Sequence, residues 1–295
     1  MLRRTFLLAA VSAARGGKGR IDFSEGAKPI TSLHYAEKWD KPFLYPLCSA
    51  KGQIISRGWP IEPRPGEKED HAWHRGIWWG HGDVNKHDFW RELGREKTSI
   101  LVPRSEPKLT ANGCQIDLDM RTPSGAVIGT VRQTYTFRLA QDLTIDAHIS
   151  IDADRNQLLV FGDTDDGGFA FRLADEFRQD RGAILLNSEG LQTTEKIWGQ
   201  PARWVDYSAN VNGTPIGVAI FDHPKNLRHP TRWHARGYSL CSANPFGLRS
   251  FTKDKSQDGS YTLDAGKTLE FRYRVLIHEG MGERAALDNA WSQYK

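Results

Sequence analysis

The chain has 295 residues and a net charge of +4, since 40 basic side chains nearly balance 36 acidic ones. A domain of this length buries a substantial core without disulfides. No basic block stands clear of acidic neighbours, which excludes nucleic acid as the expected partner. Ten tryptophans stand out in a chain whose mean hydropathy is −0.56. Most of them are expected in the core, but indole faces also hold ligands.

Residues 1–14 are typical of an export signal. Arg3 and Arg4 form a short basic start, and the apolar run from Thr5 to Ala14 is too short to span a bilayer. The order of residues 3–7 resembles a twin-arginine signal, and an ordinary Sec signal is the equal alternative. We predict a signal peptide at 1–14 and one domain at 15–295. That domain is expected to be periplasmic or secreted, with no membrane insertion after signal removal.

The first polar segment, residues 71–92, is the part of the chain richest in chemically active side chains. Histidine transfers protons near neutral pH, and a neighbouring carboxylate sets its tautomer and raises its pKa. The pairs His81 with Asp83 and His87 with Asp88 are therefore candidates for acid–base chemistry or ligand orientation. The alternative is that these groups satisfy one another's hydrogen bonds in a polar loop.

A metal site in the same segment is a further alternative. His71 and His74 could combine with His81, Asp83 or His87 to hold Zn²⁺ or Fe²⁺. The spacing matches no fixed metal motif, and the same side chains could instead contact sugar hydroxyls. No cofactor is firmly predicted, and a divalent metal remains open.

Period-two alternation of apolar and polar residues recurs through the middle of the chain. Residues 114–120, 131–139 and 143–151 each place apolar side chains on one face, and a turn at 122–125 separates the first two. The acidic turn at 163–168 could bind Ca²⁺, but it lacks the regular spacing of a calcium loop and is more often a solvated turn.

A hairpin is predicted at residues 205–220, around the turn pair Asn212-Gly213. The late alternation at 269–277 predicts another strand, and only residues 282–294 show helical spacing. Sheets with one apolar face must pack against another sheet. We therefore predict an all-β, large two-sheet antiparallel sandwich with a short C-terminal helix.

The second polar segment, residues 223–247, carries planar donors suited to recognising oxygens, Arg232 and Asn244. His229 and His234 lie too far apart for both to face one site from a single strand. We predict that the two polar segments line one pocket, because distant strands become neighbours in a sandwich and a ligand site needs converging polar groups. An aromatic wall from Trp78, Trp79 or Trp233 is expected there.

In these two segments the chain resembles the PmoA-type family of exported bacterial proteins, often labelled methane oxygenase PmoA. The resemblance covers nearly the whole mature chain, although this sequence has His71-Ala72-Trp73-His74 where the family commonly has His-Pro-His-His. The residues that carry it are His74-Arg75-Gly76 with Trp78, His81-Gly82-Asp83-Val84-Asn85, Asp88-Phe89-Trp90, His229-Pro230-Thr231-Arg232-Trp233-His234 and Ala243-Asn244-Pro245-Phe246-Gly247.

The resemblance implies a fold similar to galactose mutarotase, a large sandwich with a sugar site on one concave face. Membrane methane monooxygenase needs transmembrane helices, and the chain has no such segment after its signal. The label therefore fits this sequence poorly. The family brings no settled reaction.

The predicted function is action on a sugar or sugar derivative by His/carboxylate acid–base chemistry, as an epimerase, mutarotase, lyase or hydrolase. A non-catalytic sugar-binding protein and a metal-dependent oxidoreductase are the alternatives, and the expected partner is a small-molecule carbohydrate. His81 is the first candidate for general acid. The candidate catalytic residues are His74, His81 and Asp83; the candidate substrate-binding residues are Arg75, Trp78, Asn85, Asp88, His229, Arg232, His234 and Asn244; and the metal candidates are His71, His74, His81 and His87.

Overall fold

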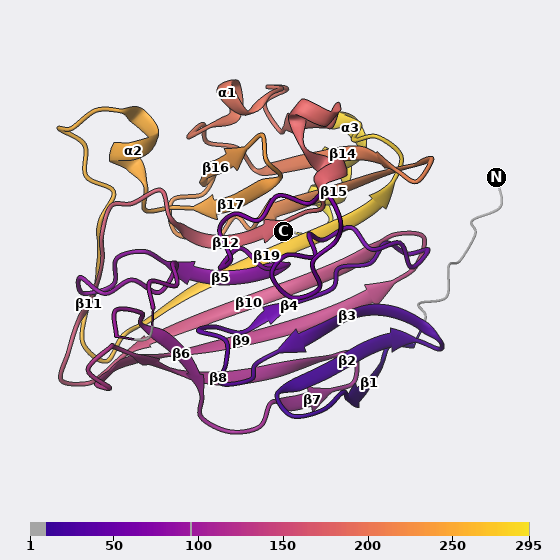
Figure 1. The fold of residues 1–295 in the computed structure, drawn as a ribbon. Coiled ribbons are helices and arrows are strands. Elements are labelled where there is room, and N and C mark those ends of the chain that lie inside the picture. The colour runs from indigo at the N-terminus through magenta and orange to yellow at the C-terminus, as the bar shows by residue number, and fades with distance from the viewer. Residues whose placement is uncertain (1–9, 95, 295) are drawn as a thin grey trace.

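The computed structural model describes residues 10–94 and 96–294, and strands dominate its regular structure. Two large antiparallel sheets enclose one hydrophobic core, and a small separate pair joins β11 (Leu159–Phe161) to β18 (Tyr261–Leu263). Figure 1 shows the strands of both sheets running across the molecule, with the helices at its top. The predicted two-sheet antiparallel sandwich is confirmed.

The first sheet has eight strands in the spatial order β1-β2-β3-β4-β5-β12-β17-β16. β12 pairs with β5 on one side and β17 on the other, so it brings the two polar segments into one sheet. The bounds are β1 Ser12–Arg15, β2 Arg20–Glu25, β3 Lys28–His34, β4 Phe43–Leu44, β5 Ile77–His81, β12 Gly167–Arg172, β17 Leu240–Asn244 and β16 Arg232–Arg236.

The second sheet has nine strands in the order β13-β14-β15-β19-β10-β9-β8-β6, with β7 also pairing with β8. Its long strands bury every second residue, which is the pattern expected when one face meets a core. The bounds are β13 Ile184–Asn187, β14 Trp204–Val211, β15 Thr214–Asp222, β19 Thr268–Glu279, β10 Leu143–Ala153, β9 Val127–Leu139, β8 Gly113–Arg121, β6 Ile100–Pro103 and β7 Lys108–Thr110.

Short helices lie outside the sheets. Leu287 and Trp291 of the C-terminal helix α3 pack with Trp204 and Phe221 on the side of the second sheet that faces away from the core. The helices are α1 Thr194–Ile197, α2 Leu248–Thr252 and α3 Arg284–Ser292, with 3₁₀ turns η1 Asp175–Phe177 and η2 Gln179–Arg181.

The local predictions hold in detail. The predicted strands at 114–120, 131–139, 143–151 and 269–277 lie within β8, β9, β10 and β19. Asn212 and Gly213 both have positive φ angles, 50° and 82°, as the tight turn between β14 and β15 requires. The predicted C-terminal helix is present as α3.

The two sides of β5 have different surroundings. Alternate side chains of a strand point to opposite faces. Ile77 and Trp79 accordingly join the core between the sheets, while Trp78 packs with Phe43 and Trp90 on the other side. We call that other side the outer face of the eight-stranded sheet.

The predicted signal peptide falls partly outside the described residues. Residues 12–14 lie in β1, which pairs in register with β2 at the edge of the first sheet. The signal peptide and the export route stay predictions. Within the described ranges, no helix is long and apolar enough to cross a membrane.

Gly76→Ala is expected to destabilise the fold far more than Gly26→Ala. Both glycines have positive φ angles, +47° and +56°, so each change carries a similar backbone cost of about 1 kcal/mol. A Cβ at Gly76 would lie 1.8 Å from the carbonyl oxygen of Leu44, whereas nothing lies within 4 Å at Gly26. Urea titrations should show that Gly76→Ala lowers the free energy of unfolding by about 2 kcal/mol or more beyond the effect of Gly26→Ala. Equal losses in both variants would contradict this account.

Candidate functional site

The two polar segments meet in the eight-stranded sheet, where β5, β12, β17 and β16 are consecutive neighbours. On the outer face the rings of His71 and Tyr238 stack, with centroids 5.6 Å apart. On the core side the rings of His81 and Phe246 lie 4.8 Å apart. The two polar segments are therefore in contact, but the contacts fall on both sides of the sheet, so a single pocket lined by both segments stays a prediction.

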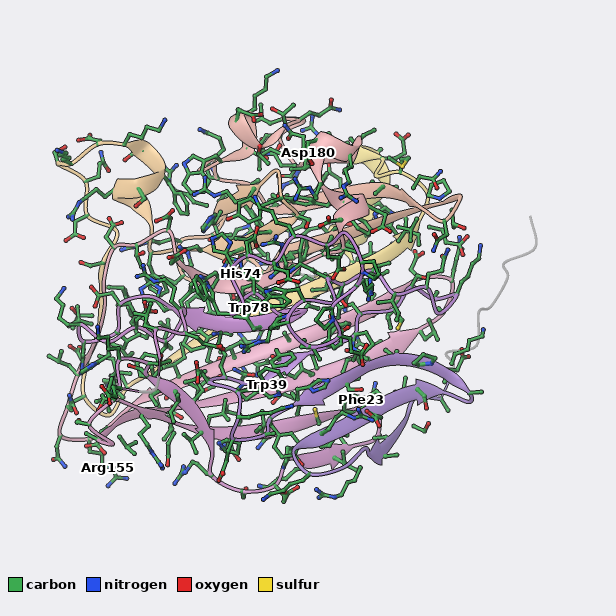
Figure 2. The ribbon with its side chains drawn as sticks, viewed as in Figure 1. Phe23, Trp39, His74, Trp78, Arg155 and Asp180 are labelled. Carbon is green, nitrogen blue, oxygen red and sulfur yellow. The ribbon has the colours of Figure 1, made fainter. Side chains whose placement is uncertain are left out.

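An aromatic cluster lies beneath the outer face. His74 stacks on Trp78 at 5.3 Å and lies edge-on to Trp90 at 5.7 Å, and Figure 2 shows His74 beside Trp78. Burial, followed by the charge of Arg172, holds the pKa of His74 well below its ordinary value. His74 is thus a neutral, enclosed ring, and the fully buried Trp78 supports the surface from below.

Two buried guanidinium groups share one carboxylate below this surface. Oδ1 of Asp70 accepts a hydrogen bond from Arg57 Nη1 at 2.7 Å and from Arg172 Nη2 at 3.0 Å. Burial acts to raise the pKa of Asp70, but the charges of Arg172 and Arg57 and a bond from His71 hold that pKa below its usual value. Arg57 also donates to the carbonyl oxygens of Asp70, His71 and His74. The network therefore fixes residues 70–74 against the sheet.

His71 sits above this network in a backbone conformation that few non-glycine residues adopt, with φ at 40°. Its Nδ1 lies 3.1 Å from Oδ1 of Asp70, and 41% of the side chain is exposed. The bond at Nδ1 leaves Nε2 as the nitrogen that can exchange a proton with a ligand. A strained backbone at an exposed, oriented imidazole is typical of a functional position.

Asp166 is the carboxyl group best placed for acid–base chemistry. Burial, reinforced by the charge of Asp165, raises the pKa of Asp166 to about 6 against the opposing charges of Arg91 and His71. Arg91 Nε lies 3.6 Å from its Oδ2, and 27% of the Asp166 side chain remains exposed. A carboxyl group that titrates near pH 6 can both take up and release protons close to neutrality.

His234 faces the outer side but is fully engaged. Its Nδ1 donates to the carbonyl oxygen of Asp165 at 2.7 Å, and its Nε2 accepts from Arg236 Nε at 2.9 Å. Burial, followed by the charge of Arg236, lowers the pKa of His234 to about 4. This neutral imidazole orients Arg236 and stays outside proton transfer.

His81 points into the core, on the same side of β5 as Trp79. It is fully buried, and its Nε2 donates to the carbonyl oxygen of Gly162 at 2.9 Å. Burial lowers the pKa of His81 to about 4. Asp83 accepts a bond from the backbone N–H of Lys86 at 2.9 Å and stabilises the turn there. These placements do not support the predicted roles of general acid for His81 and partner for Asp83.

Three further predicted binding residues of the first segment hold the scaffold together. Arg75 is 3% exposed and pairs with Glu92. Asp88 accepts hydrogen bonds from the backbone of Trp90 and from Arg91, and thereby positions Arg91 beside Asp166. Asn85 donates to the carbonyl of Leu158 and accepts from the N–H of Val160, which joins its loop to β11.

The predicted residues of the second segment divide between two places. Asn244 donates to the carbonyls of Thr164 and Asp165 and so shapes the acidic turn that carries Asp166. Arg232 donates to the carbonyl of Gly199 at 2.6 Å. His229 lies apart from both, since its Nδ1 bonds Asp222 at 2.6 Å and its ring stacks on Trp291 of α3. His229 belongs to the support of the C-terminal helix.

The four metal candidates do not form one cluster. His71 and His74 stack 4.9 Å apart on the outer face, while His81 points to the core. Across residues 10–94 and 96–294, no group of three or more His, Cys, Asp or Glu is arranged to hold a metal ion. His87 lies in the turn at 84–87, where its backbone pairs with that of Val84.

The sequence patterns missed the groups that matter most on this face: Asp166, Arg91, Arg172, Tyr238 and Arg236. The sequence indicates the acidic turn at 163–168, but as a possible calcium loop or a solvated turn. Asn244, 78 positions after Asp166 in the sequence, holds that turn in place. The turn is followed by Gly167-Gly168, and glycines within a strand allow neighbouring strands to approach closely.

The molecule is thus an antiparallel β-sandwich with a polar surface, supported by buried aromatic rings, on the outer face of one sheet. The chain belongs to the family of unknown function DUF6807, which matches residues 20–292. No curated protein matches the chain significantly. The PmoA-type name stays a resemblance of motifs.

Solved structures resemble the chain at low identity. A galactose mutarotase-like protein from Clostridium acetobutylicum is 10% identical with a TM-score of 0.44, over 92% of this chain and 99% of that one. Galactose 1-epimerase from Lactobacillus acidophilus is 10% identical with a TM-score of 0.40, over 94% of this chain and 100% of that one.

Asp70→Asn is expected to destabilise the protein strongly. The change removes the carboxylate charge that the buried guanidiniums of Arg57 and Arg172 both contact, which costs about 3 kcal/mol. Asp180→Asn is the matched control, because Asp180 pairs with Arg178 at the surface with 63% of its side chain exposed. Chemical denaturation should show a large decrease in the free energy of unfolding for Asp70→Asn and little change for Asp180→Asn. Two equally stable variants would rule out the shared-carboxylate network.

Stability should fall as the pH is lowered from about 6.5 to 4. The folded-state pKa values of His81 and His234 are about 4, below the ordinary value of 6.5. The unfolded chain therefore binds protons in this window that the folded chain does not. Protonation of each histidine lowers the free energy of unfolding by on the order of 3 kcal/mol at pH 4. Urea titrations at pH 7, 5.5 and 4.5 should show that the free energy of unfolding falls less for His234→Gln than for the unchanged protein. An equal fall in both proteins would contradict the lowered pKa of His234.

Proposed function

We propose that this protein is an exported enzyme that acts on a carbohydrate by acid–base catalysis, with Asp166 and His71 as the proton-transfer groups. The observation that carries the proposal is the position of Asp166. Its carboxyl titrates at about pH 6, beside Arg91 and within the electrostatic influence of His71, on a partly exposed surface. Export rests on the N-terminal sequence alone.

The reaction class that fits this pair is proton exchange at the anomeric centre of a sugar, as in mutarotation. Ionised Asp166 takes the proton of the anomeric hydroxyl as the bond from the anomeric carbon to the ring oxygen breaks. Nε2 of His71 delivers a proton to that ring oxygen, and the reverse steps close the ring on either face. The sum of atoms and charges is unchanged, so no cofactor is consumed.

The surrounding groups have supporting roles in this proposal. Arg91 stabilises the ionised form of Asp166 and can donate to a sugar hydroxyl. Tyr238 presents a partly exposed ring that stacks with His71 at 5.6 Å and lies over Arg172 at 4.6 Å. An aromatic face beside converging polar groups is the usual composition of a small-ligand site.

Two other functions remain alternatives with defined tests. A non-catalytic sugar-binding protein would use the same surface and would bind sugars without exchanging their anomers. A metal-dependent oxidoreductase is what the label of the PmoA-type family suggests. Elemental analysis of the purified native protein decides between a metal-loaded and a metal-free enzyme.

Asp166→Asn should lower the rate of anomeric exchange at least about 100-fold, because an amide cannot accept the proton. Magnetisation-transfer NMR on a panel of aldoses measures the rate directly. The unchanged enzyme should lose activity as the pH falls below about 6, when Asp166 becomes protonated. Asp264→Asn, a change in an exposed turn, is the matched control. Full exchange by Asp166→Asn, or no exchange of any aldose by the unchanged protein, would refute the catalytic proposal.

A further inference from the structure

A hollow lined in part by Asp165 lies next to the candidate site. It has a volume of about 530 Å³, within the range typical of small-ligand pockets. Its walls come from α1, β16 and α2, which Figure 1 shows together at the upper edge of the eight-stranded sheet. The lining residues are Asp165, Thr194, Glu195, Trp198, Ala235, Arg236, Ser250 and Lys253. We call this hollow the Trp198 pocket.

Trp198 is held rigidly in this pocket. The guanidinium of Arg236 stacks over its ring at 3.9 Å, and the rings of His234 and Phe251 meet it edge-on at 4.9 Å and 5.2 Å. Because three side chains fix the indole, little conformational entropy of the protein is lost when a ligand contacts it. The indole remains partly exposed, so it can contact a ligand.

The charges that line the pocket balance. Arg236 Nη2 lies 3.5 Å from Asp165 Oδ2, and the remaining charged lining groups are one cation, Lys253, and one anion, Glu195. A pocket for an anionic ligand would carry an excess of positive charge. A balanced set of donors and acceptors around an indole instead suits a neutral, polyhydroxylated ring.

The pocket and the reacting groups are adjacent along one loop. Asp165 lines the pocket, and the next residue, Asp166, lies beside Arg91 and within the electrostatic influence of His71. A ligand bound at Asp166 that extends past Asp165 therefore enters the Trp198 pocket.

We infer that the Trp198 pocket binds a second, neutral sugar ring, so that the substrate is a glycoside of at least two rings with its free anomeric end at Asp166. This inference rests on the proposed function for the identity of the ring at Asp166. The binding of a second ring can be tested without turnover.

The test compares disaccharides with their component monosaccharides. Asp166→Asn serves as the background protein, and saturation-transfer NMR measures binding of maltose, cellobiose, lactose, glucose and galactose. Adding Trp198→Ala should weaken the best disaccharide at least tenfold more than it weakens the matching monosaccharide. Trp198→Phe, which keeps an aromatic ring, should restore most of the affinity for the disaccharide that Trp198→Ala loses.

A second variant guards against loss of folding. Ser250→Trp fills the pocket from α2 and leaves Trp198 in place, and it should also select against disaccharides; thermal unfolding verifies that each variant is folded. Equal weakening of disaccharides and monosaccharides, or no binding of any disaccharide, would overturn the inference. Disaccharide binding that depends on Trp198 but comes without anomeric exchange in the unchanged protein would overturn the proposed catalysis and leave the second-ring pocket standing.

Discussion

The outer face depends on one carboxylate, Asp70, that two buried guanidiniums share. Without Asp70, the buried charges of Arg57 and Arg172 would lose the carboxylate that both contact, and removing one partner of a buried ion pair is strongly destabilising. With it, Arg57 can bind three carbonyl oxygens of the loop at 70–74, and the loop can hold His71 in a conformation it would not adopt alone. The position of an exposed imidazole is thus set by an ion network that lies beneath the surface.

Neutral histidines complete this support. His74 and His234 are both enclosed, and their depressed pKa values keep them uncharged in a region that already contains several arginines. Each accepts a hydrogen bond from a guanidinium, since Arg172 approaches His74 and Arg236 approaches His234. Protonation would place like charges side by side, so the same geometry that orients the arginines excludes these imidazoles from proton transfer.

The strands could be predicted from the sequence because alternation is a local property that one buried face imposes on each strand. The side of the sheet that each residue faces could not, and His81 illustrates why. Trp78 and Trp79 are both fully buried, so their apolar character does not show which of the two faces the core. His81 lies two residues after Trp79 and shares its face, so its direction is equally undetermined. That choice depends on the second sheet. Asp166 could not be singled out for a similar reason. Burial is the main cause that raises its pKa, and burial depends on segments distant in the sequence that pack around it, such as that of Arg91, 75 positions earlier.

The contrast between buried and exposed ion pairs has a consequence for ionic strength. The contacts of Asp70 with Arg57 and Arg172 involve guanidiniums with no exposed area, so dissolved salt screens them weakly. Arg91 is 42% exposed beside Asp166, and mobile ions reach that pair. Salt therefore alters the titration of Asp166 and the approach of ligands while the loop that carries His71 stays in place. Ionic strength acts on the chemistry of this surface and leaves its architecture intact.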